Sequence, residues 1–149
     1  MIRTAAELLA EARSGLRRLT PAQALEAMTA GAALVDIRDD AQRAREGEIA
    51  RAWIVPRNVL EWRFADAQGA RDPRLPERSG LPIVLCGQGF QSSLAARELQ
   101  QLGFARATDV IGGFAGWVEA GLPVAPYGTG DVTRAIAGGP ASPHPDAYA

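Results

Sequence analysis

The sequence has very little of three residue types that often carry chemistry. All 16 basic residues of the 149-residue chain are arginine, which excludes a lysine Schiff base and a Walker-type phosphate loop. The single cysteine, Cys86, excludes an internal disulfide and a cysteine-rich zinc site. The single histidine, His144, lies between prolines, which argues against a Cys/His dyad, a Ser/His/Asp triad and a histidine metal cluster. Any thiol chemistry therefore rests on Cys86 alone, and we expect neither a metal nor another cofactor.

The chain also lacks long apolar runs and a strong excess of charge. Its apolar stretches are shorter than the roughly 20 residues that cross a bilayer, and none follows a basic start like that of a signal peptide. A net charge of −1 offers no broad basic face for nucleic acid. With 47% hydrophobic and 22% charged residues, the composition is that of a soluble globular protein. We therefore predict a cytoplasmic protein with no nucleic-acid or membrane partner.

Three segments are expected along the chain. Apolar residues recur with helical spacing over 1–19, with acids and arginines between them, which predicts a docked N-terminal helix. Residues 20–124 carry the strand and helix patterns of a single domain. From residue 125 the chain is rich in Gly, Pro, Ala and Ser, so 125–149 is predicted to be a flexible C-terminal tail.

Short apolar strands alternate with helical patterns in the central segment. The predicted strands are 33–37, 52–55, 82–85 and 107–111, and the predicted helices are 21–30, 94–102 and 114–120. Ser92 and Ser93 are read as N-caps of the second of these helices. Connections of this length are too long for hairpins, so the pattern predicts an α/β fold with a small, mostly parallel sheet and helices on both faces.

Cys86 follows an apolar strand directly and precedes a glycine-containing loop and a helix. In parallel sheets, sites lie at the carboxyl ends of the strands. The free N–H groups and the dipole of the following helix favour an anion there, and Gly87 and Gly89 let the loop turn its N–H groups toward the sulfur. A thiolate held in this way could attack a sulfur donor, and the resulting persulfide would occupy the same cradle. The alternative is that a lone cysteine after a strand is simply a small buried residue.

Four segments in order resemble the rhodanese-like domain family, and the resemblance covers 20–124. Val35 to Arg38 look like the family's VD[VI]R strand end, and 47–52 align with its GHIPGA segment. Residues 85–92 look like the active-site loop, and 111–124 match the closing GGxxxWxxAGLPV signature. Any one of these motifs alone would be weak, but four in the family's order make the match specific.

The resemblance implies a sulfurtransferase. Cys86 would take sulfane sulfur from a donor such as thiosulfate or 3-mercaptopyruvate, hold it as a persulfide and pass it to a thiol or to cyanide. The substrate-binding residues would be those whose backbone N–H groups form the anion cradle, namely Gly87, Gln88, Gly89, Phe90, Gln91 and Ser92. Asp36 and Arg38 would brace the site as a structural pair.

Two departures from the family pattern qualify this expectation. Glu48 stands where the family usually has His, and the loop 86–91 has no cationic side chain. An anionic donor would then depend on the backbone or on an arginine from elsewhere, with Arg57 and Arg63 as the nearest, so we predict weak turnover of thiosulfate.

Two alternatives to this enzyme remain open. The first is a non-catalytic or sulfur-relay module that binds a protein partner, with the aromatic Phe90 at the loop tip. The second is a phosphatase, which would need an arginine where this chain has Ser92.

Overall fold

A five-stranded, all-parallel sheet forms the centre of the described chain. The computed structural model describes residues 1–67 and 69–132. The strands are β1 (Ala33–Asp36), β2 (Trp53–Ile54), β3 (Pro82–Leu85), β4 (Thr108–Asp109) and β5 (Asp131–Val132), in the order β4-β3-β1-β2-β5. The helices are α1 (Ala5–Arg13), α2 (Pro21–Thr29), α3 (Asp40–Glu46), α4 (Leu60–Ala65), α5 (Gln91–Gln101) and α6 (Gly113–Glu119), with a 3-10 turn, η1 (Arg57–Val59), before α4. The predicted α/β fold with a parallel sheet is confirmed.

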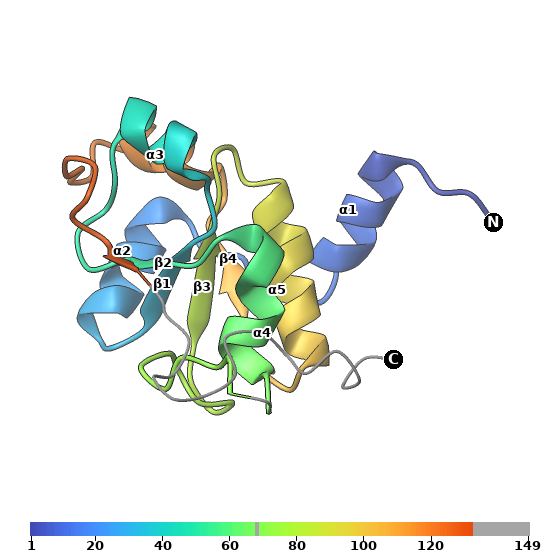
Figure 1. Cartoon of the computed structure of the whole chain (residues 1–149). Coiled ribbons are helices and arrows are strands. Elements are labelled where there is room, and N and C mark those ends of the chain that lie inside the picture. The colour runs from blue at the N-terminus through green and yellow to red at the C-terminus, as the bar shows by residue number, and fades with distance from the viewer. Residues whose placement is uncertain (68, 133–149) are drawn as a thin grey trace.

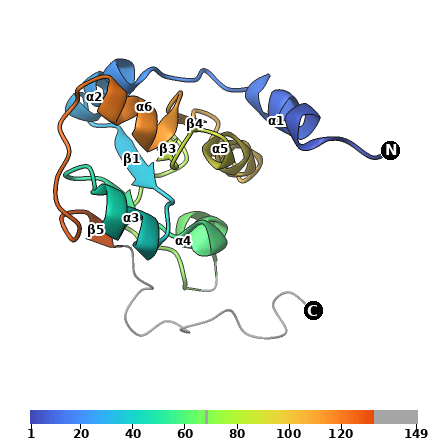
Figure 2. The same ribbon diagram turned by 90° about the horizontal axis from the view of Figure 1, so that it is seen from above.

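Helices cover both faces of the sheet, with α2 and α6 on one side and α4 and α5 on the other (Figure 2). Alternate side chains of a strand point to opposite faces. Leu34 and Ile83 therefore lie in the core that includes Trp117 of α6, while Val35 and Val84 lie in the core that includes Leu99 of α5. Both faces of β1 and β3 are buried, which explains why these strands read as continuous apolar runs.

The strand register brings the ends of β1 and β3 to the same edge of the sheet. Asp36 pairs with Leu85, so the segment that follows β1 and the loop that begins at Cys86 leave the sheet side by side. Arg38 and Cys86 thus meet at the carboxyl edge, the usual place for a site in a parallel sheet.

The N-terminal helix is shorter than the predicted 1–19. A capping box of Thr4 and Glu7 begins α1, and the helix ends at Arg13, before Ser14 and Gly15. Glycine disfavours a helix, so the periodic pattern did not continue as one. The helix packs against α5 (Figure 1). The chain then runs to Leu19, whose backbone pairs with that of Val110.

The predicted flexible tail does not begin at residue 125. Ala125 exchanges two backbone hydrogen bonds with Glu48, and β5 adds a fifth strand beside β2. Backbone pairing needs few apolar side chains, so the composition of this segment gave no sign of it. The remainder of the predicted tail, with His144, lies outside the described residues.

The Glu48 side chain binds the backbone of this C-terminal segment. Its side chain is 1% exposed, accepts a hydrogen bond of 2.8 Å from Gly130 N–H and pairs with Arg43 at 2.9 Å. Burial works to raise the pKa of Glu48, but hydrogen bonds from the Gly130 and Gly128 backbone and from Arg43, together with the charge of Arg43, lower the pKa below its ordinary value. Where the family that the sequence resembles usually has His, this chain therefore has a buried carboxylate that binds residues of the 125–130 segment.

Candidate functional site

Cys86 is the first residue after β3 and is 7% exposed. Its Sγ accepts hydrogen bonds from two backbone N–H groups, that of Gly89 at 3.2 Å and that of Ser92 at 3.3 Å. Both donors belong to the predicted cradle. Both N–H groups direct the positive end of their dipole at the sulfur, so the loop has the geometry of an anion cradle.

The carbonyl groups of the same loop are held on its outer side. Phe114 N–H donates to the Cys86 carbonyl at 2.8 Å, and Ala115 N–H donates to the Gly87 carbonyl at 3.0 Å. These donors come from the first turn of α6, which begins with the glycine pair of the closing motif. Because the carbonyls are bound here, the loop presents N–H groups to the sulfur and keeps oxygen lone pairs away from it.

The close approach of α6 to the loop depends on Gly113. Its φ is +60°, and a Cβ at this position would lie 2.7 Å from Gly89 N and 2.9 Å from Gln88 N. Any side chain would push the Cys86 loop away from α6. Gly113 of the closing motif is therefore a packing requirement of the sulfur cradle.

Ser92 and Ser93 do not cap α5 as predicted. The helix begins at Gln91, with Phe90 in the capping position and no side-chain cap. Both serine Oγ atoms instead donate to Asp109 Oδ2, each at 2.7 Å. Asp109 ends β4 and is fully buried, so its carboxylate needs donors more than the exposed start of a helix does.

Asp36 and Arg38 form the predicted pair at the end of β1. Both side chains are fully buried, and Arg38 Nη2 donates to Asp36 Oδ2 at 2.7 Å and to the Gly47 carbonyl at 2.8 Å. The guanidinium also lies over the Phe114 ring, 3.9 Å from its centre. The pair thus connects β1, the 47–52 segment and α6 around the floor of the site.

A cavity of about 740 Å³ opens in front of Cys86. Gly87, Gln88, Phe90 and Gln91 of the predicted binding set line it. Its other lining residues are Ile37, Arg38, Asp39, Gln42, Arg45, Glu46, Pro56, Arg57, Asn58 and Ala115. Three arginines therefore face a space that also holds two carboxylates.

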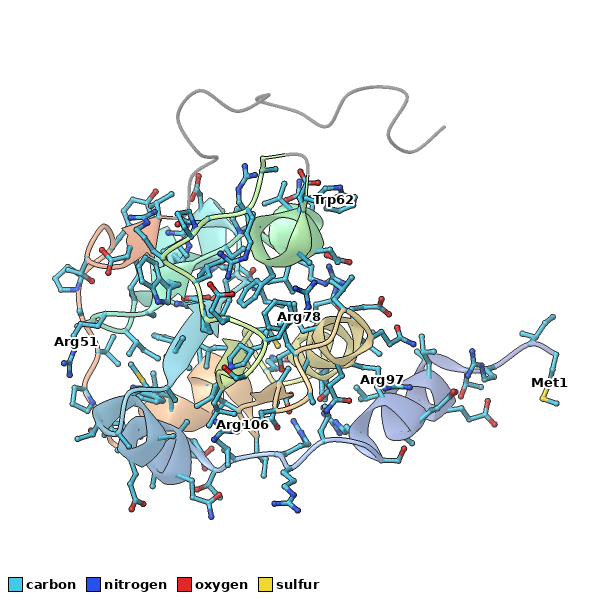
Figure 3. All side chains as sticks on the ribbon, turned by 90° about the horizontal axis from the view of Figure 1, so that it is seen from below. Met1, Arg51, Trp62, Arg78, Arg97 and Arg106 are labelled. Atoms are coloured by element: carbon cyan, nitrogen blue, oxygen red, sulfur yellow. The ribbon has the colours of Figure 1, made fainter. Side chains whose placement is uncertain are left out.

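The structure separates the two arginines that the sequence suggested. Arg57 lines the cavity, where its Nη1 also donates to Glu61 at 2.8 Å. Arg63 is not one of the described residues that line the cavity. Its Nη1 instead donates to the Ala70 carbonyl at 3.1 Å. Arg57 lies in the 3-10 turn η1 and Arg63 lies in α4, so the two side chains leave different elements and point to different faces. Trp62 lies on the outer side of α4 (Figure 3), away from the cavity.

Sequence reasoning missed several side chains around the site. Arg45 lines the cavity because its helix, α3, starts a few residues after β1 ends, at the same edge of the sheet as Cys86. The charged, helix-compatible residues that follow the first strand were visible in the sequence. Three further side chains bind the loop and the start of α5 on the side away from the cavity, namely Arg13, Arg18 and Asp109. No local sequence pattern predicts their role. Across residues 1–67 and 69–132, no cluster of His, Cys, Asp and Glu could hold a metal ion. The helices of the same residues include none that is long and apolar enough to span a membrane.

Comparison with known proteins gives a consistent picture. The family model of the rhodanese-like domain matches residues 20–120. The thiosulfate sulfurtransferase GlpE of Haemophilus influenzae is 32% identical over 108 residues, which is 72% of this chain and 93% of that protein. The GlpE protein of Actinobacillus pleuropneumoniae is 34% identical over 107 residues, covering 71% of this chain and 90% of that protein.

A solved structure from Rhodopseudomonas palustris also resembles this chain. Its protein is of unknown function and is described as a possible tyrosine phosphatase. It superposes with a TM-score of 0.76 at 30% identity, covering 83% of this chain and 96% of the other.

Proposed function

This chain belongs to the rhodanese-like domain family, and on that basis we propose that it is a sulfurtransferase that works through a persulfide on Cys86. The observation that carries the proposal is the pair of backbone N–H groups, from Gly89 and Ser92, on Cys86 Sγ at the floor of an open cavity. In this proposal the fixed dipoles of the loop carry the negative charge on the reacting sulfur, so the reaction needs no histidine base.

The proposed reaction has two steps. The Cys86 thiolate attacks the outer sulfur of thiosulfate, a sulfur–sulfur bond forms, and sulfite leaves with the electron pair of the bond that breaks. A thiophilic acceptor such as cyanide then attacks the terminal sulfur of the persulfide, leaves as thiocyanate and restores the Cys86 thiolate. With 3-mercaptopyruvate as donor, the first leaving group is the enolate of pyruvate. Throughout, the negative charge stays near the N–H groups of the loop.

Recognition of the donor falls to the arginines that line the cavity. Arg57 and Arg45 are the candidates for an incoming anion, since Arg38 is fully buried and bonded both to Asp36 and to the Gly47 carbonyl. Each candidate also has a carboxylate close by, Glu61 at 2.8 Å from Arg57 and Glu46 at 3.5 Å from Arg45. Part of their charge is therefore offset, and we propose that turnover of the thiosulfate dianion is modest.

Intact-mass measurement tests the proposal. Purified protein is incubated with thiosulfate or with 3-mercaptopyruvate, and we expect a gain of one sulfur atom on Cys86 that cyanide removes as thiocyanate. A Cys86→Ser variant is the matched control and should gain nothing. A wild-type protein that stays unmodified with both donors would contradict the proposal.

A second candidate function rests on Phe90. This side chain is 58% exposed beside the cavity, which suits docking of a protein partner at the site. In a sulfur relay, a Phe90→Ala variant would lose transfer to a protein thiol and keep transfer to cyanide. If Cys86 accepts no sulfur from any donor, a binding module becomes the better description.

A further inference from the structure

Two arginines from outside the family-matched region reach the loop of Cys86. Arg13 Nη2 donates to the Gly89 carbonyl at 2.7 Å, and Arg18 Nη2 donates to the same oxygen at 3.1 Å. Both residues precede residue 20, where the family match begins. Gly89 is one of the two residues whose N–H groups bind Cys86 Sγ. The N-terminal segment is therefore in direct contact with the back of the sulfur cradle.

Each guanidinium is fixed by a second partner. Arg18 Nε donates to Asp109 Oδ1 at 2.8 Å, and this carboxylate also accepts hydrogen bonds from Ser92 and Ser93. Arg13 Nε donates to Ser93 Oγ at 3.0 Å. The two arginines thus connect the loop to the end of β4 and to the first turn of α5.

The helix α1 provides the rigid support for Arg13. Arg13 is its last residue, and α1 packs beside α5 (Figure 2). Since α5 begins at the end of the Cys86 loop, a side chain from α1 reaches the loop without crossing the sheet. The position of α1 follows from packing and explains why a segment outside the family match can act on the site.

The Gly89 carbonyl is a sensitive point of the cradle. Along the chain, this carbonyl lies between the two N–H donors of Gly89 and Ser92. The direction in which it points therefore sets the path of the backbone that connects the donors. Gly89 has a φ of +86°, and a Cβ there would lie 2.8 Å from Gly112 N, so the position requires glycine. Glycine leaves the backbone free to rotate unless other groups hold it. A carbonyl that turned toward the sulfur would repel the thiolate and the persulfide.

We propose that Arg13 and Arg18 are positioning residues, which hold the Gly89 carbonyl on the outer side of the loop and so keep the N–H donors on the sulfur anion. The Cys86 and Gly87 carbonyls are held in the same way by α6. The N-terminal segment therefore completes the cradle and brings positive charge behind it. This inference rests on the proposed function only in taking Cys86 as the reactive thiol.

The pH dependence of Cys86 alkylation by iodoacetamide tests the inference in the full chain. An Arg13→Gln variant should move the midpoint of the alkylation profile upward by about half a unit to one unit, less than the full effect of one charge-assisted hydrogen bond, because Arg13 acts on the sulfur only through the Gly89 backbone and Arg18 still holds the same carbonyl. Loading of sulfur from thiosulfate below that midpoint should slow by up to about tenfold. Arg13→Lys, which keeps the charge and a donor, should recover part of both effects.

Arg17→Gln is the matched control. Arg17 is an exposed arginine of the same segment, and its substitution removes the same charge. It should leave both the profile and the loading rate unchanged. Thermal unfolding of each variant shows whether it is folded at the temperature of the assay.

Arg18 is tested together with its carboxylate partner. Loss of Arg18 alone would leave the buried Asp109 without its cation and could prevent folding, so the variant is Arg18→Gln with Asp109→Asn. We expect the same upward shift of the alkylation profile.

An Arg13→Gln protein that is folded and has the wild-type alkylation profile would overturn the inference, even if its melting temperature falls. Failure of the proposed function gives a different result. In that case the wild-type protein forms no persulfide on Cys86, while Arg13→Gln still shifts the alkylation profile.

Discussion

Substitution of Gly113 by alanine tests the packing of α6 against the Cys86 loop. Two costs add at this position. A φ of +60° places an alanine in the left-handed region, which costs about 1–2 kcal/mol. The new Cβ would also lie 2.7 Å from Gly89 N and 2.9 Å from Gln88 N, and relief of such crowding costs about 1–3 kcal/mol. We expect the free energy of unfolding to fall by about 2–5 kcal/mol in total.

The same substitution should impair Cys86 more than stability alone requires. The loop has to move by several tenths of an ångström to accommodate the Cβ, which takes the Gly89 N–H away from the sulfur. Misplacement by about 1 Å can cost about 100-fold in rate, so we expect a large loss of sulfur transfer in protein that is still folded.

Gly121→Ala separates the two costs. Gly121 has a φ of +73° with nothing within 4 Å of its Cβ position, so this variant pays only the backbone penalty of about 1–2 kcal/mol. Urea unfolding gives the stability of each variant, and iodoacetamide alkylation reports on Cys86. Equal destabilisation of the two variants, with alkylation unchanged in both, would refute the packing argument.

Three further predictions concern the surroundings of the site. Because the pKa of Glu48 is lowered in the folded protein, its contribution to stability is present above the unfolded carboxyl value of about 4.3 and is lost as the pH falls through the folded pKa. Glu48→Gln should therefore lose about 2 kcal/mol at pH 7 and show a shallower fall in stability below about pH 4, as measured by urea unfolding; an unchanged acid limb would contradict this. Arg57→Gln should raise the KM for thiosulfate severalfold while Arg63→Gln leaves it unchanged, and equal effects would refute the assignment of Arg57 to the cavity. Because residue 92 is a serine bonded to Asp109 in place of a phosphate-binding arginine, the protein should not hydrolyse p-nitrophenyl phosphate, and hydrolysis that Cys86→Ser abolishes would contradict the reasoning.

The sequence by itself determined the central part of the site. The apolar run before Cys86, the glycines after it and the helical pattern that follows are local features, and each depends mainly on neighbouring residues. They were enough to predict a strand, an anion cradle and a helix in that order. The order of the four motifs was enough to identify the family.

The tertiary structure decided which distant side chains meet this loop. Ser92 and Ser93 are of the residue type that usually caps a helix, yet both donate to Asp109. Asp109 is distant in the sequence and comes within reach only because β4 lies beside β3. In the same way, Arg57 faces the cavity and Arg63 does not, because the turn before α4 and the helix itself present different faces. Local pattern cannot specify such contacts, since a buried polar group takes whichever partner the fold brings within reach.

The two ends of the described chain show the same division. The sequence predicted an N-terminal helix, but only its packing on α5 brings Arg13 to Gly89. Residues 125–132 have the composition of a tail, yet Glu48 and the outer edge of β2 bind their backbone. The periodicity and composition of a segment predict which of its own side chains are buried. Hydrogen bonds between segments far apart in the chain depend on where the whole sheet places their partners.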